Sequence, residues 1–110
     1  MHKYLLLSFV LLYSVHNYAT SLEGKVVGVT DGDTITVLDA NNTQYKVRLS
    51  GIDAPEKKQP FGQAVKQSLS DLVYDKPVQV EWHKQDRYQR IVGKVLVQGL
   101  DTNLEQVSVG

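Results

Sequence analysis

The chain has 110 residues, with 12 Lys and Arg, 12 Asp and Glu, and no Cys, a length that fits one small domain. Its 42% hydrophobic and 22% charged residues are typical of neither disordered nor fibrous chains. The lack of Cys excludes disulfide frameworks, thiolate metal sites, cysteine nucleophiles and lipid-bearing cysteines. The formal net charge of zero differs from that of a strongly basic nucleic-acid binder.

The first 21 residues predict a secretory signal peptide. A short basic region precedes an apolar run at residues 4–15, which is shorter than the roughly 20 residues that span a bilayer. Small residues indicate cleavage after Ser21, with cleavage after Ala19 and an uncleaved anchor as alternatives. We therefore expect a mature domain at 22–110, secreted or periplasmic, without stable membrane association.

The domain begins with strand patterns. Runs of β-branched residues at 25–29 and 34–38 flank the segment Thr30-Asp31-Gly32-Asp33, and Asp-Gly between such runs is a hairpin signal. Residues 45–49 alternate apolar and charged side chains, which predicts a third strand with one buried face.

A helix and two more strands follow in the pattern. Four apolar residues after Pro60 recur at helical spacing and predict a helix, which Asp75-Lys76-Pro77 ends. These residues are Phe61, Val65, Leu69 and Leu72. Apolar patterns at 78–82 and 91–97 predict two strands. Thr102-Asn103-Leu104-Glu105 has the spacing of a capping box and predicts a second helix from about Asn103.

Five short strands with a helix between the third and fourth predict a mainly β fold with some helix. The pattern matches an OB-type, partly open five-stranded barrel, an architecture that often binds oligonucleotides or sugars. The second helix stops at the last residue, Gly110, and is expected to be truncated. The fold alone supports only a binding role.

Charged residues occur at four places that such a barrel could bring together. They are Asp31 and Asp33 at the hairpin turn, Arg48 near the end of the third strand, Asp53 and Glu56 in the loop beyond it, and Arg90 at the start of the fifth strand. Carboxylates from separate loops suit calcium or magnesium. Two guanidiniums could bind a phosphate, and a further carboxylate could position a water. This combination indicates metal-assisted phosphodiester hydrolysis.

A small basic strip lies within residues 84–94. Lys84, Arg87, Arg90 and Lys94 stand against one acidic residue, with Tyr88 between two of the arginines. The strip is a candidate nucleic-acid contact, and a solvated strand connection is the alternative. The nearby His83 is expected to be a surface residue of a strand.

Three ordered segments carry a family resemblance. Val29-Thr30-Asp31-Gly32-Asp33-Thr34, Val47-Arg48-Leu49-Ser50-Gly51-Ile52-Asp53-Ala54-Pro55-Glu56 and Asp86-Arg87-Tyr88-Gln89-Arg90 resemble the signature stretches of the staphylococcal nuclease (thermonuclease) family. The resemblance implies that Asp33 and Asp53 bind calcium (Ca2+), together with the backbone carbonyl of Ala54, where the family usually has Thr. It covers residues 22–110 and about the first two-thirds of the family domain.

The same resemblance implies roles for the other charged residues. Glu56 corresponds to the residue regarded as general base on the attacking water, a role disputed within the family. Arg48 and Arg90 correspond to the arginines that hold the phosphate and stabilise charge in the transition state. Asp31 corresponds to an acid behind the metal ligands, and Tyr88 to a residue near the nucleotide. Gln89 stands where the family usually has Gly.

The resulting expectation is a secreted, calcium-dependent endonuclease that hydrolyses DNA and RNA with water as the nucleophile. A monomer is expected, with Lys84, Arg87 and Tyr88 contacting the nucleic acid. One alternative is a catalytically silent OB-fold module that binds single-stranded nucleic acid. The other is a truncated, inactive product of a longer gene.

Overall fold

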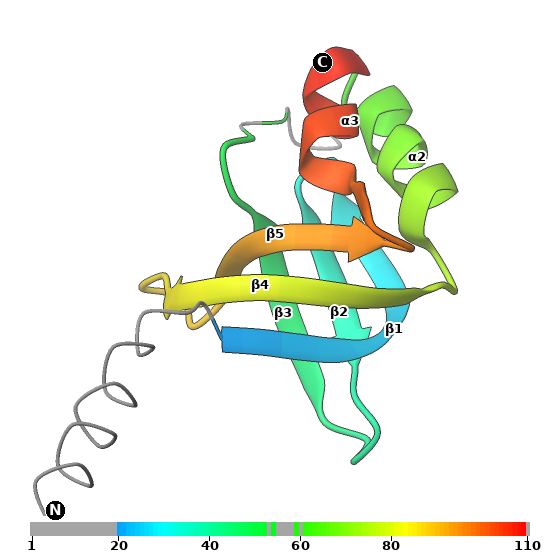
Figure 1. The fold of residues 1–110 in the computed structure, drawn as a ribbon. Helices are drawn as coiled ribbons and strands as arrows, with labels where there is room; N and C mark the ends of the chain where they lie inside the picture. Colours follow the sequence, from blue (N-terminus) through cyan, green and yellow to red (C-terminus); the bar gives the residue numbers. More distant parts are fainter. Residues whose placement is uncertain (1–19, 53, 55–58, 60, 110) are drawn as a thin grey trace, which may run out of the picture.

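The computed structural model describes residues 20–52, 54, 59 and 61–109. In this part of the chain, strands come first, then a helix, then further strands and a last helix (Figure 1). In chain order the elements are β1 (Thr20–Asp31), β2 (Thr34–Leu38), β3 (Gln44–Leu49), α2 (Gly62–Val73), β4 (Pro77–Gln85), β5 (Ile91–Val97), β6 (Leu100–Asp101) and α3 (Thr102–Val109).

The strands close into a mixed barrel. They are hydrogen-bonded in the order β3-β2-β1-β4-β5-β6, and an additional pairing between β3 and β5 closes the sheet. The β3–β5 pairing is parallel, and all other pairings are antiparallel. The two-residue strand β6 pairs with the end of β5, at Leu96 and Val97. The predicted five-stranded barrel with a helix between β3 and β4 is therefore confirmed.

Strand β1 is much longer than the predicted 25–29. Its first half pairs with β4 and its second half with β2, and register shifts at Val27 and Thr30 mark bulges within the second half. Bulges bend a strand and increase its twist, which agrees with the curved course of β1 in Figure 1. Thr20 and Ser21 already pair with Trp82 and Glu81 of β4. Residues 1–19 of the predicted signal peptide lie outside the described residues.

The barrel interior is filled by alternate strand residues. Val47 and Leu49 are fully buried while Arg48 between them is half-buried, as the alternation of residues 45–49 predicted. Complete burial of an aliphatic side chain contributes about 1.5–3 kcal/mol, so these positions account for much of the stability. The core comprises Val26, Ile35, Val37, Val47, Leu49, Ile52, Leu69, Val73, Val78, Val80, Ile91 and Val95.

Helix α2 covers one end of the barrel (Figure 1). Leu69 and Val73 are buried in the core, while Val65 is half-buried. The predicted start was wrong, because Phe61 has a φ of 65° and lies outside the helix, which begins at Gly62. Phe61 is 82% exposed and does not belong to the apolar face.

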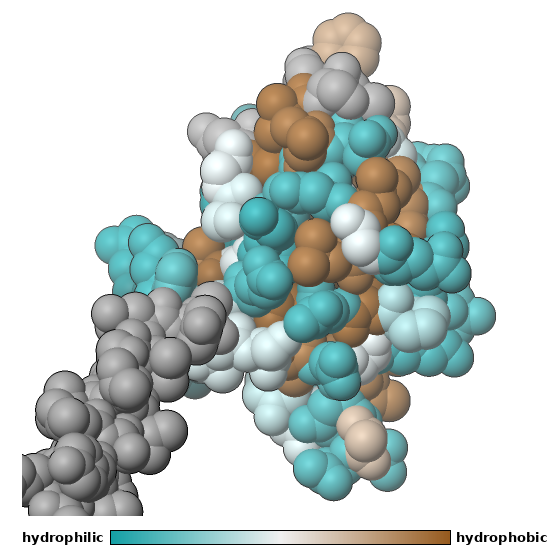
Figure 2. Space-filling view, in the orientation of Figure 1, coloured by the Kyte–Doolittle hydropathy of each residue, from teal (hydrophilic) through white to brown (hydrophobic). Residues whose placement is uncertain are grey.

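Helix α3 begins at Thr102, one residue before its predicted start. The predicted capping residue was also wrong, because Asp101 Oδ1 accepts the hydrogen bond of 3.0 Å from the amide of Leu104. Thr102 is instead fully buried. Leu104 and Val107 are 66% and 54% exposed, and hydrophobic surface is visible over α3 in Figure 2. In the described part of the chain, neither helix has the length and apolar character needed to cross a membrane.

Candidate active site

Asp33 lies in the turn between β1 and β2 and is only 8% exposed. Its Oδ1 accepts a hydrogen bond of 2.9 Å from Oγ1 of Thr34, and its Oδ2 accepts one of 3.3 Å from the amide of Ala54. Its main-chain carbonyl accepts a hydrogen bond of 2.8 Å from the amide of Leu49. A buried carboxylate needs such partners to offset its desolvation. These contacts join the turn to β3 and to the loop that follows β3.

Arg48, near the end of β3, is the charged partner of Asp33. The strand register pairs Arg48 with Thr34, and Nη2 of Arg48 lies 3.5 Å from Oδ2 of Asp33. Its Nη1 donates a hydrogen bond of 3.1 Å to the carbonyl of Ile52. The side chain is 27% exposed, and these two contacts fix the orientation of the guanidinium.

The loop after β3 carries two further predicted site residues, Asp53 and Glu56, which lie outside the described residues. Ala54 is described and half-buried, and its amide points to Asp33. The structure therefore brings Asp33, Arg48 and Ala54 together. The roles of Asp53, Glu56 and the Ala54 carbonyl stay predictions.

Arg90 belongs to a tight turn between β4 and β5 that is organised by Asp86. Oδ1 of Asp86 accepts hydrogen bonds of 2.9 Å from the amide of Tyr88 and 3.0 Å from the amide of Arg90. Its Oδ2 accepts a bond of 2.8 Å from Nε of Arg90. Gln89 completes the turn with a φ of 66°, a conformation that costs a residue other than glycine about 1–2 kcal/mol. This backbone conformation explains why Gly suits that position.

These contacts lower the pKa of Asp86. Desolvation acts in the opposite direction, but the hydrogen bonds from the Arg90 backbone and side chain and from the Tyr88 amide, together with the Arg90 charge, outweigh it. The carboxylate therefore stays ionised and keeps holding Arg90 below the pH at which an ordinary Asp becomes protonated.

The β3–β5 pairing relates the two arginines to each other. Arg90 directly precedes Ile91, which pairs with Val47, and Arg48 directly follows Val47. Ile91 and Val47 are buried, so the residues next to them face away from the core. Arg48 on β3 and Arg90 in the turn directly before β5 consequently lie on the same outer face of the barrel.

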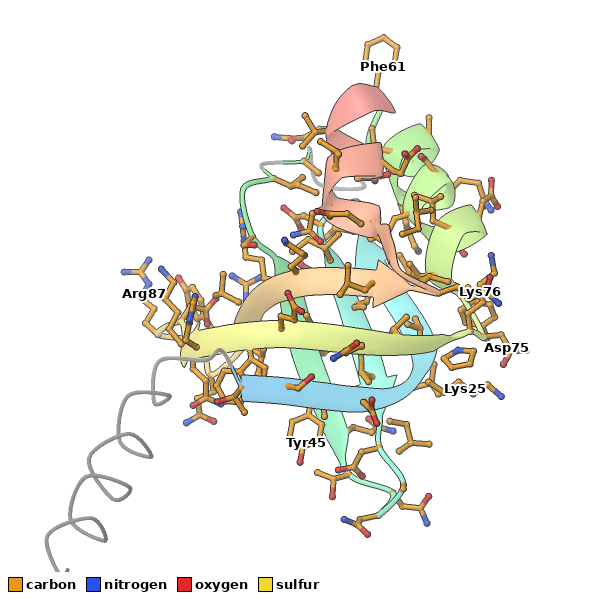
Figure 3. The ribbon with its side chains drawn as sticks, viewed as in Figure 1. Lys25, Tyr45, Phe61, Asp75, Lys76 and Arg87 are labelled. Carbon is orange, nitrogen blue, oxygen red and sulfur yellow. The ribbon has the colours of Figure 1, made fainter. Side chains whose placement is uncertain are left out.

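Tyr88 lies close to two guanidiniums at the exposed turn. The Cζ atoms of Arg87 and Arg90 are 5.0 Å and 5.5 Å from the centre of its ring, within the range of cation–π attraction. Nη2 of Arg87 also donates a hydrogen bond of 2.9 Å to the Tyr88 hydroxyl. Tyr88 is 63% exposed, and Arg87 projects from this end of the barrel in Figure 3. The turn thus presents positive charge and an aromatic ring to solvent.

Lys84 lies on the same outer face. It pairs with Val92, and Val92 pairs in turn with Arg48. A register shift at His83 marks a bulge in β4, and His83 is exposed, as predicted for a surface strand residue. A pocket of about 330 Å³ on this face is lined by Ser50, Glu81, His83, Lys84, Val92, Gly93 and Lys94. The basic strip and the site therefore share one surface.

The chemistry of Asp33 fits a hard cation. Its Oδ2 has two long contacts, at 3.3 Å and 3.5 Å, which leave lone pairs for a ligand. Asp31 lies half-buried at the other side of the same turn. Within the ranges that the structure describes, no three His, Cys, Asp or Glu side chains are grouped for a metal ion. A complete oxygen ligand set would need the loop that carries Asp53.

Two buried amides at the site were not predicted from the sequence. Asn103 and Gln106 of α3 are 7% and 1% exposed, and both bond to the turns beside the site. Their spacing of three residues on a predicted helix was the available signal.

Comparison with known proteins agrees with this arrangement. A model of the family described as "Staphylococcal nuclease homologue" matches residues 46–110. The chain is 46% identical to an uncharacterized endonuclease of Haemophilus influenzae over 110 residues, which cover 98% of this chain and 62% of that protein. The chain belongs to the staphylococcal nuclease family.

Two further relatives extend the comparison within this nuclease family. The chain is 39% identical to an uncharacterized endonuclease of Escherichia coli over 112 residues, covering all of this chain and 71% of that one. It is 46% identical to a protein named micrococcal nuclease from Shigella flexneri over 86 residues, covering 78% of this chain and 48% of that one. The chain thus spans less than two-thirds of the length of the Haemophilus and Shigella relatives.

Proposed function

We propose that this protein is a calcium-dependent endonuclease that hydrolyses phosphodiester bonds of DNA and RNA by attack of water. The observation that carries the proposal is the contact of the buried Asp33 carboxylate with the Arg48 guanidinium at 3.5 Å. This contact joins a hard-oxygen ligand to a phosphate-binding group at a barrel edge. The endonuclease and micrococcal nuclease names of the relatives support it.

The two arginines bind the phosphate in this proposal. Arg48 is held by Asp33 and by the Ile52 carbonyl, so its guanidinium is oriented before the substrate arrives. Arg90 is held by Asp86 through Nε, which leaves its terminal amino groups to stabilise charge that develops in the transition state. Preoriented donors are more effective than mobile ones because little reorganisation is needed during the reaction.

Calcium would be held by Asp33, Asp53 and the Ala54 carbonyl. A bound divalent cation polarises a phosphoryl oxygen and lowers the pKa of a bound water. Glu56 would accept the proton from the attacking water, and Asp31 would support the ligands from behind. Arg87, Tyr88 and Lys84 would contact the neighbouring part of the nucleic acid, with the protein acting as a monomer.

The test is cleavage of labelled DNA and RNA by the purified chain, with calcium and then with a chelator. We expect cleavage with calcium and none with chelator, since Asp33 then lacks its cation. Binding without cleavage under both conditions would favour the silent single-stranded nucleic-acid module. Cleavage that is undiminished by chelator would contradict the calcium requirement.

We also propose export through a signal peptide at residues 1–21. N-terminal sequencing of the exported protein tests this, and a start at Thr20 or Leu22 is expected. Because Thr20 and Ser21 pair with Trp82 and Glu81, a start at Thr20 would keep the whole of β1. An intact Met1 would show an uncleaved anchor.

A further inference from the structure

The face of α3 that packs on the barrel is polar. Asn103 and Gln106 lie one helical turn apart and are 7% and 1% exposed, whereas Leu104 and Val107 are largely exposed. An ordinary surface helix buries its apolar side chains and exposes its amides. The reversed pattern indicates that the two amides have a specific task in the protein interior.

Gln106 binds the turn that carries Asp33. Its Nε2 donates hydrogen bonds of 2.9 Å to the carbonyls of Gly32 and Val65, and its Oε1 accepts one of 3.1 Å from Oγ of Ser68. The two donors and one acceptor site of the amide are therefore used. Gly32 lies between Asp31 and Asp33, so this single side chain ties the acidic turn to α2.

The same turn is fixed sterically. A Cβ atom at Gly32 would lie 2.3 Å from Cγ1 of Val65 and 3.1 Å from Cβ of Ala54. The turn is therefore pressed against both α2 and the loop after β3. Because Gln106 also holds the Gly32 carbonyl, Asp33 has little freedom to move away from Arg48 and Ala54.

Asn103 binds the second turn beside the site. Its Nδ2 donates hydrogen bonds of 2.9 Å to the carbonyl of Ser50 and 3.1 Å to the carbonyl of Gly93. Its Oδ1 accepts a bond of 3.0 Å from the amide of Val95. Ser50 begins the turn between β3 and Ala54, so Asn103 fixes the start of that loop to β5.

We propose that Asn103 and Gln106 are positioning residues that hold the Asp33 turn and the loop after β3 at the spacing needed for the reaction. The inference rests on the proposed function. Both residues act through other groups, Gln106 through Gly32 and Asn103 through Ser50. Partners of this kind behind metal ligands typically change metal affinity or activity about 10–100-fold when removed.

The test compares Gln106→Met, which keeps the length of the side chain but removes its donors, with Val78→Ala. Val78 is a core residue of β4 that is 5% exposed and bonds to neither turn. Ser68→Ala is the milder variant, because it removes only the partner of Oε1. Calcium binding by calorimetry, kcat, thermal stability and hydrogen exchange of the Leu49 amide, which bonds to the Asp33 carbonyl, are measured for each.

We expect Gln106→Met to weaken calcium binding by about tenfold or more, to lower kcat and to speed exchange at Leu49. Val78→Ala should lower the melting temperature without changing calcium binding or kcat, and it should speed Leu49 exchange only as far as the loss of global stability requires. Equal calcium affinity, kcat and Leu49 exchange in the two variants would overturn the proposal. If Gln106→Met does not fold, Ser68→Ala decides, because Ser68 fixes the orientation of the amide that donates to Gly32. Unaltered calcium binding and Leu49 exchange in Ser68→Ala would then overturn the proposal.

Failure of the proposed function has a different signature. If the unsubstituted chain binds no calcium and cleaves nothing, the endonuclease proposal fails. The Leu49 exchange rates still report whether Gln106 holds the turn, since they require neither metal nor substrate. Leu49 exchange that is faster in Gln106→Met than its loss of global stability explains, with no such excess in Val78→Ala, supports the positioning role in that case, and the lack of an excess in Gln106→Met overturns it.

Discussion

Two ion pairs at different ends of the barrel differ in distance and in surroundings. Asp33 and Arg48 are 3.5 Å apart, with side chains 11% and 27% exposed. Lys25 and Asp75 are closer, at 2.8 Å, but 55% and 68% exposed, and they lie far from Arg87 in Figure 3. Water and salt screen the exposed pair. We therefore expect the longer, less exposed pair to have the greater consequence for function.

The Asp86–Arg90 pair is intermediate between these two. It is as short as the exposed pair, at 2.8 Å, but its side chains are 29% and 20% exposed for Arg90 and Asp86. It is also local, since the two residues are four positions apart. The three pairs thus form a series of increasing side-chain exposure, from Asp33–Arg48 through Asp86–Arg90 to Lys25–Asp75. The predictions follow that series.

The largest effect is expected for the buried pair. Arg48→Ala should lower kcat by about 10²–10³-fold, because it removes phosphate donors that act in the transition state. Arg48→Lys should recover little of this loss, because an ammonium cannot reproduce the two-pronged guanidinium contact. The measurement is single-turnover cleavage of a labelled oligonucleotide. An Arg48→Lys rate equal to that of the original protein would show that charge alone is sufficient.

The second prediction concerns Asp86. Asp86→Ala should lower kcat by about tenfold, less than Arg90→Ala, because the arginine is kept but loses its orientation. Circular dichroism melts of both variants control for unfolding. If Asp86→Ala loses as much activity as Arg90→Ala, Asp86 is needed for the turn to form and not only to orient the Arg90 side chain.

The pH dependence of this turn follows from the lowered pKa of Asp86. Because the folded pKa lies below the unfolded value, the contribution to stability is present above the unfolded pKa and is lost as pH falls through the folded pKa. The stability difference between the original protein and Asp86→Ala should therefore persist at neutral pH and shrink only below pH 3.8, the ordinary value for this group. Thermal melts over an acid pH series measure it.

The sequence predicted the barrel because its strand signals are local. The alternation of residues 45–49 and the Asp-Gly turn each specify an element without reference to the rest of the chain. The barrel pattern suggested that Asp33 and Arg48 could come together, and the resemblance implied their roles. The true length of β1 could not be predicted, because its first residues, Thr20 to Gly24, form a strand through pairing with the distant β4.

The missed residues share one physical feature, which is that long-range contacts decide their environment. A Gln on a short helix is ordinarily exposed, and only the carbonyls of Gly32 and Val65 make Gln106 a buried residue. Phe61 was assigned to an apolar face by spacing, but its positive φ turns it to solvent. Asp101 and Thr102 are both residue types that cap helix N-termini. Asp101 accepts the hydrogen bond from the Leu104 amide, whereas Thr102 is buried.

The smallest effect is expected at the exposed pair. The pKa of Lys25 is raised by the hydrogen bond to Asp75 and then by the Asp75 charge. Because the folded pKa is raised, the pair stabilises the fold fully below the unfolded pKa and ceases to do so as pH rises through the folded pKa, above 10.5. Lys25→Gln should leave cleavage unchanged and lower the melting temperature slightly at low salt, with no difference at high salt.

Lys76→Gln is the matched control for this last variant. Lys76 is an exposed lysine at the same end of the barrel (Figure 3), and its Nζ donates only a long hydrogen bond of 3.4 Å to the Asp71 carbonyl. Both variants remove one positive charge, so a change in nucleic-acid binding common to both would report net charge alone. Loss of cleavage in Lys25→Gln but not in Lys76→Gln would show that the Lys25–Asp75 ion pair affects the candidate active site. The ranking of the three pairs by burial would then be wrong.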